Sequence, residues 1–269
     1  MLQFPICKIN LGLYITSKRA DGYHNLETVF YPVSLYDALE VIPAMETNLH
    51  LSGRTVAGDV QNNLVWKAYE MMKAEFPDVV QPLDIFLHKA LPMGAGLGGG
   101  SADGAFMLRL LNDFYKLGLD KETLAAKALQ LGSDCPFFIY NTPQFAEGRG
   151  EMMQQVEVDL SAYTLQLVCP DVHISTANAF SMITPRPAPF DLRTLAQLPI
   201  QDWKNNITND FEQPIFEQVP ELARIKQQLY DGGALYASMS GSGSTIYGIF
   251  PKDRQAVIST DLNFENYSV

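Results

Sequence analysis

A glycine-rich segment at residues 92–102 (PMGAGLGGGSA) has the residue types and spacing to bind an anion. It places five glycines within seven positions, at 94, 96, 98, 99 and 100. Because glycine has no Cβ, successive backbone N–H groups in such a segment can converge on an oxyanion. A helix predicted to start after the glycines would add about half a positive charge at its N-terminus. The segment therefore predicts a loop that binds phosphate.

Two common phosphate-binding motifs fit this segment only in part. The run at 94–99 matches the dinucleotide pattern G-x-G-x-x-G, but the acid about 20 residues further on, Asp120, heads a predicted helix instead of ending a strand. A P-loop requires a lysine where this chain has Gly100. A flexible linker is disfavoured too, because apolar residues such as Leu91 and Leu97 flank the glycines. We interpret the segment as a phosphate cradle of a third kind.

Capping residues and hydrophobic periodicity predict the elements around this loop. A strand over 83–87 leads into it, and Ser101 is expected to cap a helix that runs to about residue 115. Asn63 is expected to cap an earlier helix. Asp120 is expected to cap a later one that ends at Gly132.

The N-terminal segment alternates in polarity. Apolar residues at every second position from 9 to 15 fall on one face of a predicted strand, and Lys8, Asn10 and Gly12 fall on the other. Cys7, next to Lys8, should then face the core as a small buried side chain. The strand therefore presents one apolar face and one polar face.

The composition shifts after about residue 150. Pro220 stands at a favourable first position of a predicted helix, and predicted strands over 234–239 and 245–250 flank a tight turn. A helix beside paired strands predicts a small second α+β domain. We expect one domain over 1–150 and another over 151–269.

The composition excludes several classes of protein. Of the 269 residues, 47% are hydrophobic and 18% charged, which is enough for a substantial core. No apolar run reaches the roughly 18 residues of a membrane span, and no signal peptide is evident, so a cytoplasmic protein is expected. With 19 Lys and Arg against 30 Asp and Glu, the net charge of −11 argues against nucleic-acid and membrane partners. Three cysteines without a C-x-x-C argue against a disulfide scaffold and structural zinc.

Residues 92–102 resemble the phosphate-binding motif of the GHMP kinase superfamily, and residues 5–13 and 239–245 resemble its other two motifs. Further segments are similar to one member, the kinase that acts on a methylerythritol bearing a CDP group. These segments are 8–15, 18–24 (KRADGYH), 131–138, 145–151 and 209–212 (NDFE). Departures are small: Cys7 stands where alanine is usual, and Asp134-Cys-Pro replaces Asp-Val-Pro or Asp-Ala-Pro.

The resemblance implies an α+β two-domain GHMP kinase fold. It consists of an N-terminal α/β kinase domain and a C-terminal ferredoxin-like α+β domain, with the active site in the cleft between them. It implies ATP-dependent phosphorylation of the 2-hydroxyl of the CDP-bearing methylerythritol, in the non-mevalonate isoprenoid precursor pathway. ATP and Mg²⁺ are the implied cofactors, and the sequence assigns no ligand to the metal. The only implied partner is the small-molecule substrate, and the sequence assigns no oligomeric state.

The resemblance also assigns site residues. Lys8 and Asp134 are implied to be catalytic. The implied ATP-binding residues are Asn63, Lys67, Pro92, Met93, Gly94, Ala95, Gly96, Leu97, Gly98, Gly99, Gly100, Ser101 and Ala102. The implied substrate-binding residues are Asn10, Tyr23, His24, Thr176 and Phe180, and the aromatic and imidazole groups among them suit a cytosine ring.

Elementary chemistry limits what the two catalytic residues do. An alcohol is a far weaker acid than an aspartic acid of pKa about 3.9, so Asp134 cannot deprotonate it beforehand. In a loose phosphoryl-transfer transition state the nucleophile needs little early activation. Asp134 would orient the hydroxyl and take its proton late, and the Lys8 ammonium would stabilise the developing alkoxide.

Two other functions stay open at this point. The chain could be another kinase of the superfamily that acts on a small polar alcohol such as homoserine or mevalonate, which would lack a nucleobase pocket. It could also be a nucleotide-binding regulator without catalysis, although the presence of both Lys8 and Asp134 argues against this.

Overall fold

The computed structural model describes residues 1–56 and 58–269. By its internal contacts the chain divides into two compact units. The first unit comprises Met1–Cys7, Pro32–Met93 and Gly98–Thr142, and the second comprises Lys8–Tyr31, Gly94–Leu97 and Pro143–Val269. Each unit is therefore discontinuous in sequence, and the glycine-rich segment contributes to both. The division of the chain into two domains at residue 150 stays a prediction.

The first unit contains a four-stranded sheet in the order β1-β4-β6-β5. Its strands are β1 (Leu2–Gln3), β4 (Ala38–Pro43), β5 (Asn48–Gly53) and β6 (Leu83–Lys89). β4 pairs with β6 antiparallel, and β5 pairs with β6 in parallel. Every second residue of β6 is buried, and this period places Lys89 on the buried face after three apolar side chains.

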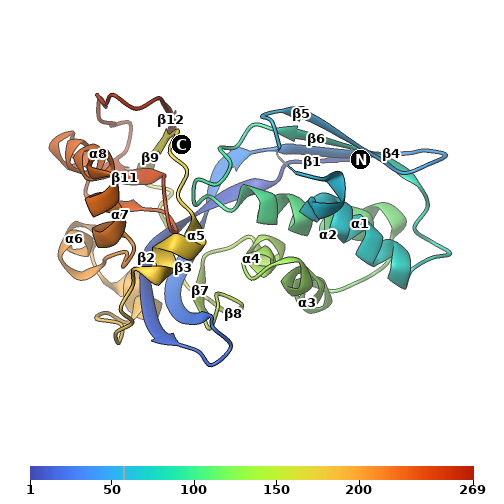
Figure 1. Cartoon of the computed structure of the whole chain (residues 1–269), viewed down its shortest axis with the longest axis horizontal. Helices are drawn as coiled ribbons and strands as arrows, with labels where there is room; N and C mark the ends of the chain where they lie inside the picture. The colour runs from blue at the N-terminus through green and yellow to red at the C-terminus, as the bar shows by residue number, and fades with distance from the viewer. Residues whose placement is uncertain (57) are drawn as a thin grey trace. The chain divides into compact units, whose positions relative to one another are not determined.

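Helices cover one side of this sheet. Figure 1 shows α1 (Leu64–Glu75) and α2 (Gly99–Tyr115) beneath the strands, with α3 (Lys121–Leu131) and α4 (Cys135–Tyr140) on the far side of these two helices. A 3₁₀ turn, η1 (Val60–Asn62), precedes α1. The central helix, α2, buries nine of its residues, as expected for a helix that is packed on both sides.

The structure confirms two predicted caps and corrects a third. Asn63 accepts a hydrogen bond from Val65 N at 2.9 Å, and Asp120 accepts one from Thr123 N at 2.8 Å, each at the start of its helix. Gly132 ends α3 as predicted. The cap assigned to Ser101 is wrong, because α2 starts at Gly99 and its N-cap is Gly98, whose left-handed backbone turns the chain into the helix.

The second unit contains most of a sheet in the order β2-β3-β7-β8. Its strands are β2 (Ile6–Lys18), β3 (His24–Tyr36), β7 (Gln144–Glu147) and β8 (Met152–Gln155). The predicted strand over 9–15 is thus confirmed and is longer than its alternation indicated. All ten residues from Ile6 to Ile15 are buried, so both faces of β2 are covered, the polar one included.

The other sheet of the second unit has the order β10-β11-β9-β12 and is antiparallel throughout. Its strands are β9 (Tyr163–Pro170), β10 (Tyr236–Met239), β11 (Ile246–Pro251) and β12 (Phe264–Ser268). This is the strand order of a ferredoxin-like βαββαβ domain, which confirms the fold expected from the resemblance. The described residues 252–263 form no helix, so the second helix of that pattern is lacking here.

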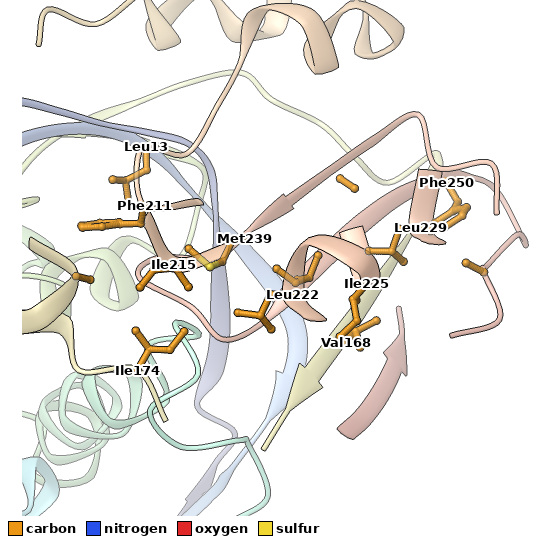
Figure 2. Packing of buried hydrophobic residues seen from close by; sticks show 14 of the residues in the cluster. Leu13, Val168, Ile174, Phe211, Ile215, Leu222, Ile225, Leu229, Met239 and Phe250 are labelled. Carbon is orange, nitrogen blue, oxygen red and sulfur yellow. The ribbon is translucent and has the colours of Figure 1, made fainter. Parts of the chain in front are cut away.

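Short helices connect β9 to β10. They are α5 (Thr176–Ser181), η2 (Leu192–Gln197), η3 (Ile200–Asp202), α6 (Trp203–Asn206), α7 (Glu212–Gln218) and α8 (Pro220–Asp231). Pro220 is the first residue of α8, as predicted. Leu222, Ile225 and Leu229 repeat at helical spacing along one face of α8 and pack into the apolar core of the unit (Figure 2).

Two expectations from composition can be compared with the structure. All three cysteines are buried and unpaired with one another, which confirms Cys7 as a buried side chain. In the part of the chain that the structure describes, no helix has both the length and the apolar character required to cross a membrane.

Candidate active site

The glycine-rich segment alternates between left-handed and ordinary backbone. Gly94, Gly96 and Gly98 have φ of +66°, +80° and +71°. The first hydrogen bond within α2 runs from Ala102 N to Gly98 O at 2.9 Å, so the N–H groups of the first turn have no acceptor inside the helix. A Cβ added at Gly100 would meet nothing within 4 Å. The first turn of α2 is therefore open to an approaching anion.

Gly96 occupies a position that no larger residue could take. A Cβ there would lie 2.0 Å from the carbonyl oxygen of Ser240, and its φ is strained for any residue with a side chain. The Gly96 carbonyl accepts hydrogen bonds from Ser240 Oγ at 2.9 Å and from Lys8 Nζ at 2.8 Å. The close approach of the backbones thus brings Gly96 O within reach of the Lys8 ammonium.

Lys8 is only 3% exposed. Besides Gly96 O, its Nζ donates to Asn10 Oδ1 at 2.7 Å and lies 5.3 Å from the ring centroid of Phe30. These contacts place the buried ammonium against two oxygens and an aromatic face. The structure therefore brings together three residues with different predicted roles. Lys8 is predicted to be catalytic, Asn10 to bind the substrate and Gly96 to bind ATP.

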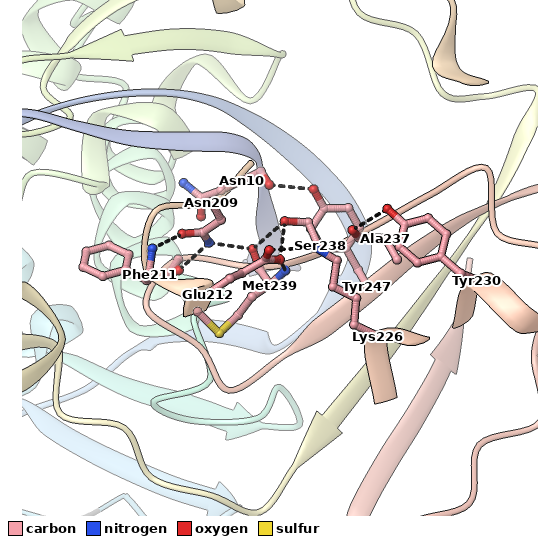
Figure 3. A network of polar contacts seen from close by, with 11 residues as sticks. Asn10, Asn209, Phe211, Glu212, Lys226, Tyr230, Ala237, Ser238, Met239 and Tyr247 are labelled. Carbon is pink, nitrogen blue, oxygen red and sulfur yellow. Dashed lines mark hydrogen bonds and ion pairs between the residues drawn. The ribbon is translucent and has the colours of Figure 1, made fainter. Parts of the chain in front are cut away.

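A chain of hydrogen bonds fixes the orientation of the Asn10 carboxamide. Thr28 Oγ1 donates to Gly12 O at 2.6 Å, so it accepts from Asn10 Nδ2 at 2.9 Å. The Asn10 amide nitrogen is thereby committed to Thr28, and its oxygen must face Lys8. Tyr247 donates from its hydroxyl to the backbone oxygen of Asn10 at 2.7 Å (Figure 3). Asn10 is held from both ends.

The predicted substrate-binding aromatics lie in the second unit. The rings of His24 and Phe180 are stacked, with centroids 5.1 Å apart and planes inclined by 19°. Thr176 Oγ1 lies 3.2 Å from Ser242 Oγ. Tyr23 is 58% exposed, and the guanidinium carbon of Arg149 lies 5.2 Å from its ring centroid. The structure brings His24 and Phe180 together, and the role of these residues toward a base stays a prediction.

Asp134 lies in the first unit, directly before α4. The carboxylate of Asp134 does not cap this helix, although the residue stands at its N-cap position. The capping and periodicity patterns described above assign no element to residues 135–140, where the structure has the six-residue helix α4. Burial raises the pKa of the neighbouring Cys135 thiol to about 12, so this cysteine stays protonated at neutral pH. The catalytic role of Asp134 stays a prediction.

Asn63 and Lys67 also lie in the first unit, at the start of α1. Asn63 accepts from Lys67 N through its backbone oxygen at 3.0 Å. A Cβ added at Gly104 of α2 would come within 2.8 Å of Leu64 Cβ, so a glycine there allows α1 and α2 to approach closely. The predicted ATP-binding residues Asn63 and Lys67 therefore lie at the start of a helix that packs against α2, the helix that follows the glycine-rich segment.

One buried charged cluster of the first unit was missed in the sequence. Lys89 forms ion pairs with Asp37 and Asp103, and all three side chains are buried. Asp37 Oδ1 also accepts from Ala90 N at 2.6 Å and Leu91 N at 2.8 Å, the residues that lead into the glycine-rich segment. The available signal was the period of β6, which places Lys89 on its apolar face.

The described residues contain no group of three or more His, Cys, Asp or Glu side chains arranged to hold a metal ion.

Comparison with known proteins decides the family. Residues 63–142 match the model of the GHMP kinases N terminal domain, and residues 193–267 match that of the GHMP kinases C terminal domain. A 4-diphosphocytidyl-2-C-methyl-D-erythritol kinase from Bacteroides fragilis is 49% identical over 98% of this chain and 96% of its own length. One from Parabacteroides distasonis is 50% identical over 94% of this chain and 92% of its own. The chain belongs to the 4-diphosphocytidyl-2-C-methyl-D-erythritol kinase family.

Solved structures agree with this family. The crystal structure of a 4-(cytidine 5'-diphospho)-2C-methyl-D-erythritol kinase matches with a TM-score of 0.76 and 30% identity, over 93% of this chain and 90% of that one. The homoserine kinase from Cytophaga hutchinsonii matches with a TM-score of 0.69 over 98% of this chain and 93% of that one, but with 14% identity it shows only the shared fold. The GHMP kinase resemblance and its fold are thus confirmed, and the chain belongs to a family of phosphotransferases with an alcohol acceptor.

Proposed function

We propose that this chain transfers the γ-phosphoryl group of ATP to the 2-hydroxyl of 4-diphosphocytidyl-2-C-methyl-D-erythritol. The observation that carries the proposal is the buried Lys8 ammonium, which is held by Asn10 and by the carbonyl of Gly96 within the glycine-rich segment. A cation tied to a predicted phosphate loop suits a reaction in which negative charge develops beside a phosphate. The names of the relatives support this substrate.

The residues of the glycine-rich segment fit the phosphates of ATP. Left-handed glycines precede a 17-residue helix, and Gly100 leaves the first turn uncovered. The N–H groups of this turn would bind phosphate oxygens, and Asn63 and Lys67 would contact the adenosine side. We include Mg²⁺ with the nucleotide, which would neutralise phosphate charge, and assign no protein ligand to it. The three buried cysteines form no disulfide, which suits the reducing cytoplasm, where we place the enzyme.

Lys8 and Asp134 take the catalytic roles. The substrate hydroxyl oxygen forms a bond to the γ-phosphorus, and the bond from that phosphorus to the bridging oxygen breaks to release ADP. The hydroxyl proton passes late to Asp134, since an alcohol is too weak an acid to lose it first. The Lys8 ammonium stabilises the charge on the attacking oxygen, and Asn10 keeps it in place.

Cytosine recognition is assigned to Tyr23, His24, Thr176 and Phe180. The stacked pair of His24 and Phe180 offers an aromatic face, and an imidazole nitrogen can bond to one edge of the base. A cytosine presents a donor at N4 beside an acceptor at N3, and uracil reverses this pattern. The pocket would therefore distinguish cytidine from uridine.

A turnover assay tests the proposal. The purified chain is mixed with ATP, Mg²⁺ and the CDP-methylerythritol, and the release of ADP is measured. Separate assays replace the CDP-methylerythritol with homoserine or with mevalonate. We expect turnover with the CDP substrate alone. Turnover on homoserine or mevalonate and none on the CDP substrate would contradict the proposed acceptor. ATP binding without turnover on any alcohol would indicate a regulator.

The catalytic roles need a separate measurement. Lys8→Met should lower kcat by about 10²-fold or more, the scale of a lost electrostatic group, whereas Lys252→Met, a lysine on the surface, should leave it unchanged. If Lys8 and Asp134 serve one chemical step, the double variant with Asp134→Asn should be about as slow as the slower single variant. Fully multiplicative losses would mean that the two residues contribute independently of each other.

A further inference from the structure

The segment Asn209–Glu212 carries more polar contacts than a loop before a helix requires. It precedes α7, and its three polar side chains each reach backbone or side chains elsewhere in the second unit. Asp210 accepts from Ile15 N at 2.8 Å, and Glu212 accepts from Met239 N at 2.8 Å. The proposed reaction as described above assigns no role to this segment.

Asn209 has the most specific arrangement of the three. Its Nδ2 donates to two backbone carbonyls, Met239 O and Gly241 O, both at 2.8 Å. Its Oδ1 accepts from Phe211 N at 2.9 Å, which fixes which end of the carboxamide faces the carbonyls (Figure 3). The side chain is 3% exposed, so both N–H groups are committed to these two carbonyls.

The two carbonyls belong to the residues on either side of Ser240. Because the backbone is held on both sides of Ser240, the position of its Cα is fixed. The Ser240 hydroxyl donates to Gly96 O at 2.9 Å. Gly96 O is also the oxygen to which Lys8 Nζ donates. Ser240 Oγ further lies 3.5 Å from Asn10 Oδ1, which also accepts from the Lys8 ammonium. Asn209 is therefore two contacts away from both oxygens that hold Lys8.

The backbone around Asn209 is tied to the strand that carries Lys8. Leu13 N donates to Thr208 O at 3.0 Å, and Asp210 N donates to Leu13 O at 2.8 Å, so Asn209 lies beside Leu13 on β2. The backbone of Asn209 thus pairs with β2, and the Asn209 side chain holds the turn after β10. This arrangement sets the spacing between Lys8 and Ser240 from both sides.

We propose that Asn209 is a positioning residue for the Lys8 ammonium, which it places through the turn that contains Ser240. The inference rests on the proposed function, since it gives Asn209 a purpose only if Lys8 takes part in phosphoryl transfer. Asn209 does not need to touch ATP or substrate. A displacement of about 1 Å at a catalytic group can lower the rate by about 10²-fold. Hydrogen bonds that hold the turn in place would prevent such a displacement of Lys8.

Glu212 provides a matched control. It accepts from Met239 N, from Ser238 Oγ at 2.9 Å and from Lys226 Nζ at 2.6 Å, so its removal costs at least as many hydrogen bonds as the loss of Asn209. None of these contacts involves the carbonyls that flank Ser240. A residue that only stabilises the fold should behave like Glu212, and a positioning residue should not.

The experiment compares Asn209→Asp, which keeps the shape and removes both donors, with Glu212→Ala. Unfolding in urea and kcat and KM for both substrates are measured for each. We expect kcat of Asn209→Asp to fall by about 10- to 10²-fold with KM for ATP nearly unchanged, and kcat of Glu212→Ala to stay within about threefold of the parent. Asn209→Ser, which introduces no buried charge, serves as the second variant if Asn209→Asp does not fold.

The outcomes separate the inference from the function beneath it. If Asn209→Asp or Asn209→Ser loses stability as Glu212→Ala does and keeps parental kcat, Asn209 is structural and the inference is overturned. In the Lys8→Met background, Asn209→Asp should lower the residual kcat no further, and a full additional loss would also overturn it. If Lys8→Met itself retains parental kcat, the proposed role of Lys8 fails, whatever the Asn209 variants do.

Discussion

Asp103→Asn should remove a large part of the pH dependence of stability. Asp103 is buried in α2, where its Oδ2 accepts from Lys89 Nζ at 2.6 Å. Its other oxygen, Oδ1, is buried without a hydrogen-bond partner among the described residues. Burial raises the pKa of Asp103 to about 8, while the ammonium of Lys89 opposes the rise and the carboxylate of Asp37 adds to it. The acid is therefore protonated at neutral pH in the folded chain.

The charge balance of the cluster is consistent with this proton. Burial alone would lower the pKa of Lys89, but its two partners, Asp103 and Asp37, together outweigh burial and raise it. With Asp103 protonated, one ammonium and the carboxylate of Asp37 remain as a neutral pair. A second ionised carboxylate would leave an uncompensated buried negative charge, which is costly.

The sign and the size of the effect follow from linkage. In the unfolded chain the Asp103 carboxyl has a pKa of about 3.9, so between about pH 4 and pH 8 it binds a proton only in the folded state. The unfolded state then binds fewer protons, and stability falls as pH rises, by about 1.4 kcal/mol per pH unit. Over about four units this reaches about 5 kcal/mol, which is lost fully once the pH passes the folded pKa.

Urea unfolding followed by circular dichroism between pH 5 and pH 8.5 measures this slope. Asparagine mimics the protonated acid and cannot ionise, so Asp103→Asn should match the parent near pH 5 and exceed it in unfolding free energy near pH 8.5. Asp120→Asn is the control, because the pKa of Asp120 is lowered by its hydrogen bonds to Thr123 and asparagine also caps a helix. Equal slopes for the parent and Asp103→Asn would refute a protonated Asp103.

Four further substitutions test the site. Asp134→Asn should lower kcat by about 10²- to 10⁴-fold, as expected for a lost acid–base group, with ATP affinity by calorimetry unchanged; turnover within about threefold of the parent would remove it from the mechanism. Gly96→Ala should destabilise the chain and weaken ATP binding, because its Cβ would lie 2.0 Å from a backbone oxygen, whereas Gly118→Ala, with a similar φ of +72° and open space, should show only the backbone strain. Phe180→Ala should weaken the CDP substrate by about 1–3 kcal/mol, the scale of one base stack, and His24→Ala should blur the preference for cytidine over uridine. Loss of ATP affinity in either variant, with the cytidine preference intact, would show that this pocket is misassigned.

Local signals in the sequence predicted local structure well. Asn63 and Asp120 cap the start of their helices, and Gly132 ends one, as expected. These predictions succeed because a cap depends only on residues within one turn. The error at Ser101 has the same origin. A serine before an apolar run is a favourable cap, but three consecutive glycines carry the helix start upstream, where Gly98 adopts a left-handed backbone that other residues avoid.

The polar networks could not be predicted from the sequence. Asn209 and Met239 are separated by 30 residues, and Lys89 and Asp37 by 52. Residue type shows that an asparagine or a lysine can make several hydrogen bonds, but not which partners the fold supplies. The resemblance named the segment that contains Asn209, and only the structure connects it to Lys8.

The polar face of β2 illustrates the same limit at one strand. Alternation correctly placed Lys8 and Asn10 on one face, and in an antiparallel sheet such a face is commonly the solvated one. Here it is buried, and hydrogen bonds link its polar groups in sequence, from Lys8 through Asn10 and Thr28 to Gly12 O. A solvated face needs no such partners, because water satisfies it, whereas a buried one must satisfy every donor from within. The alternation of polar and apolar residues cannot predict these partners, and it is the partners that show the polar face of β2 to be buried instead of solvated.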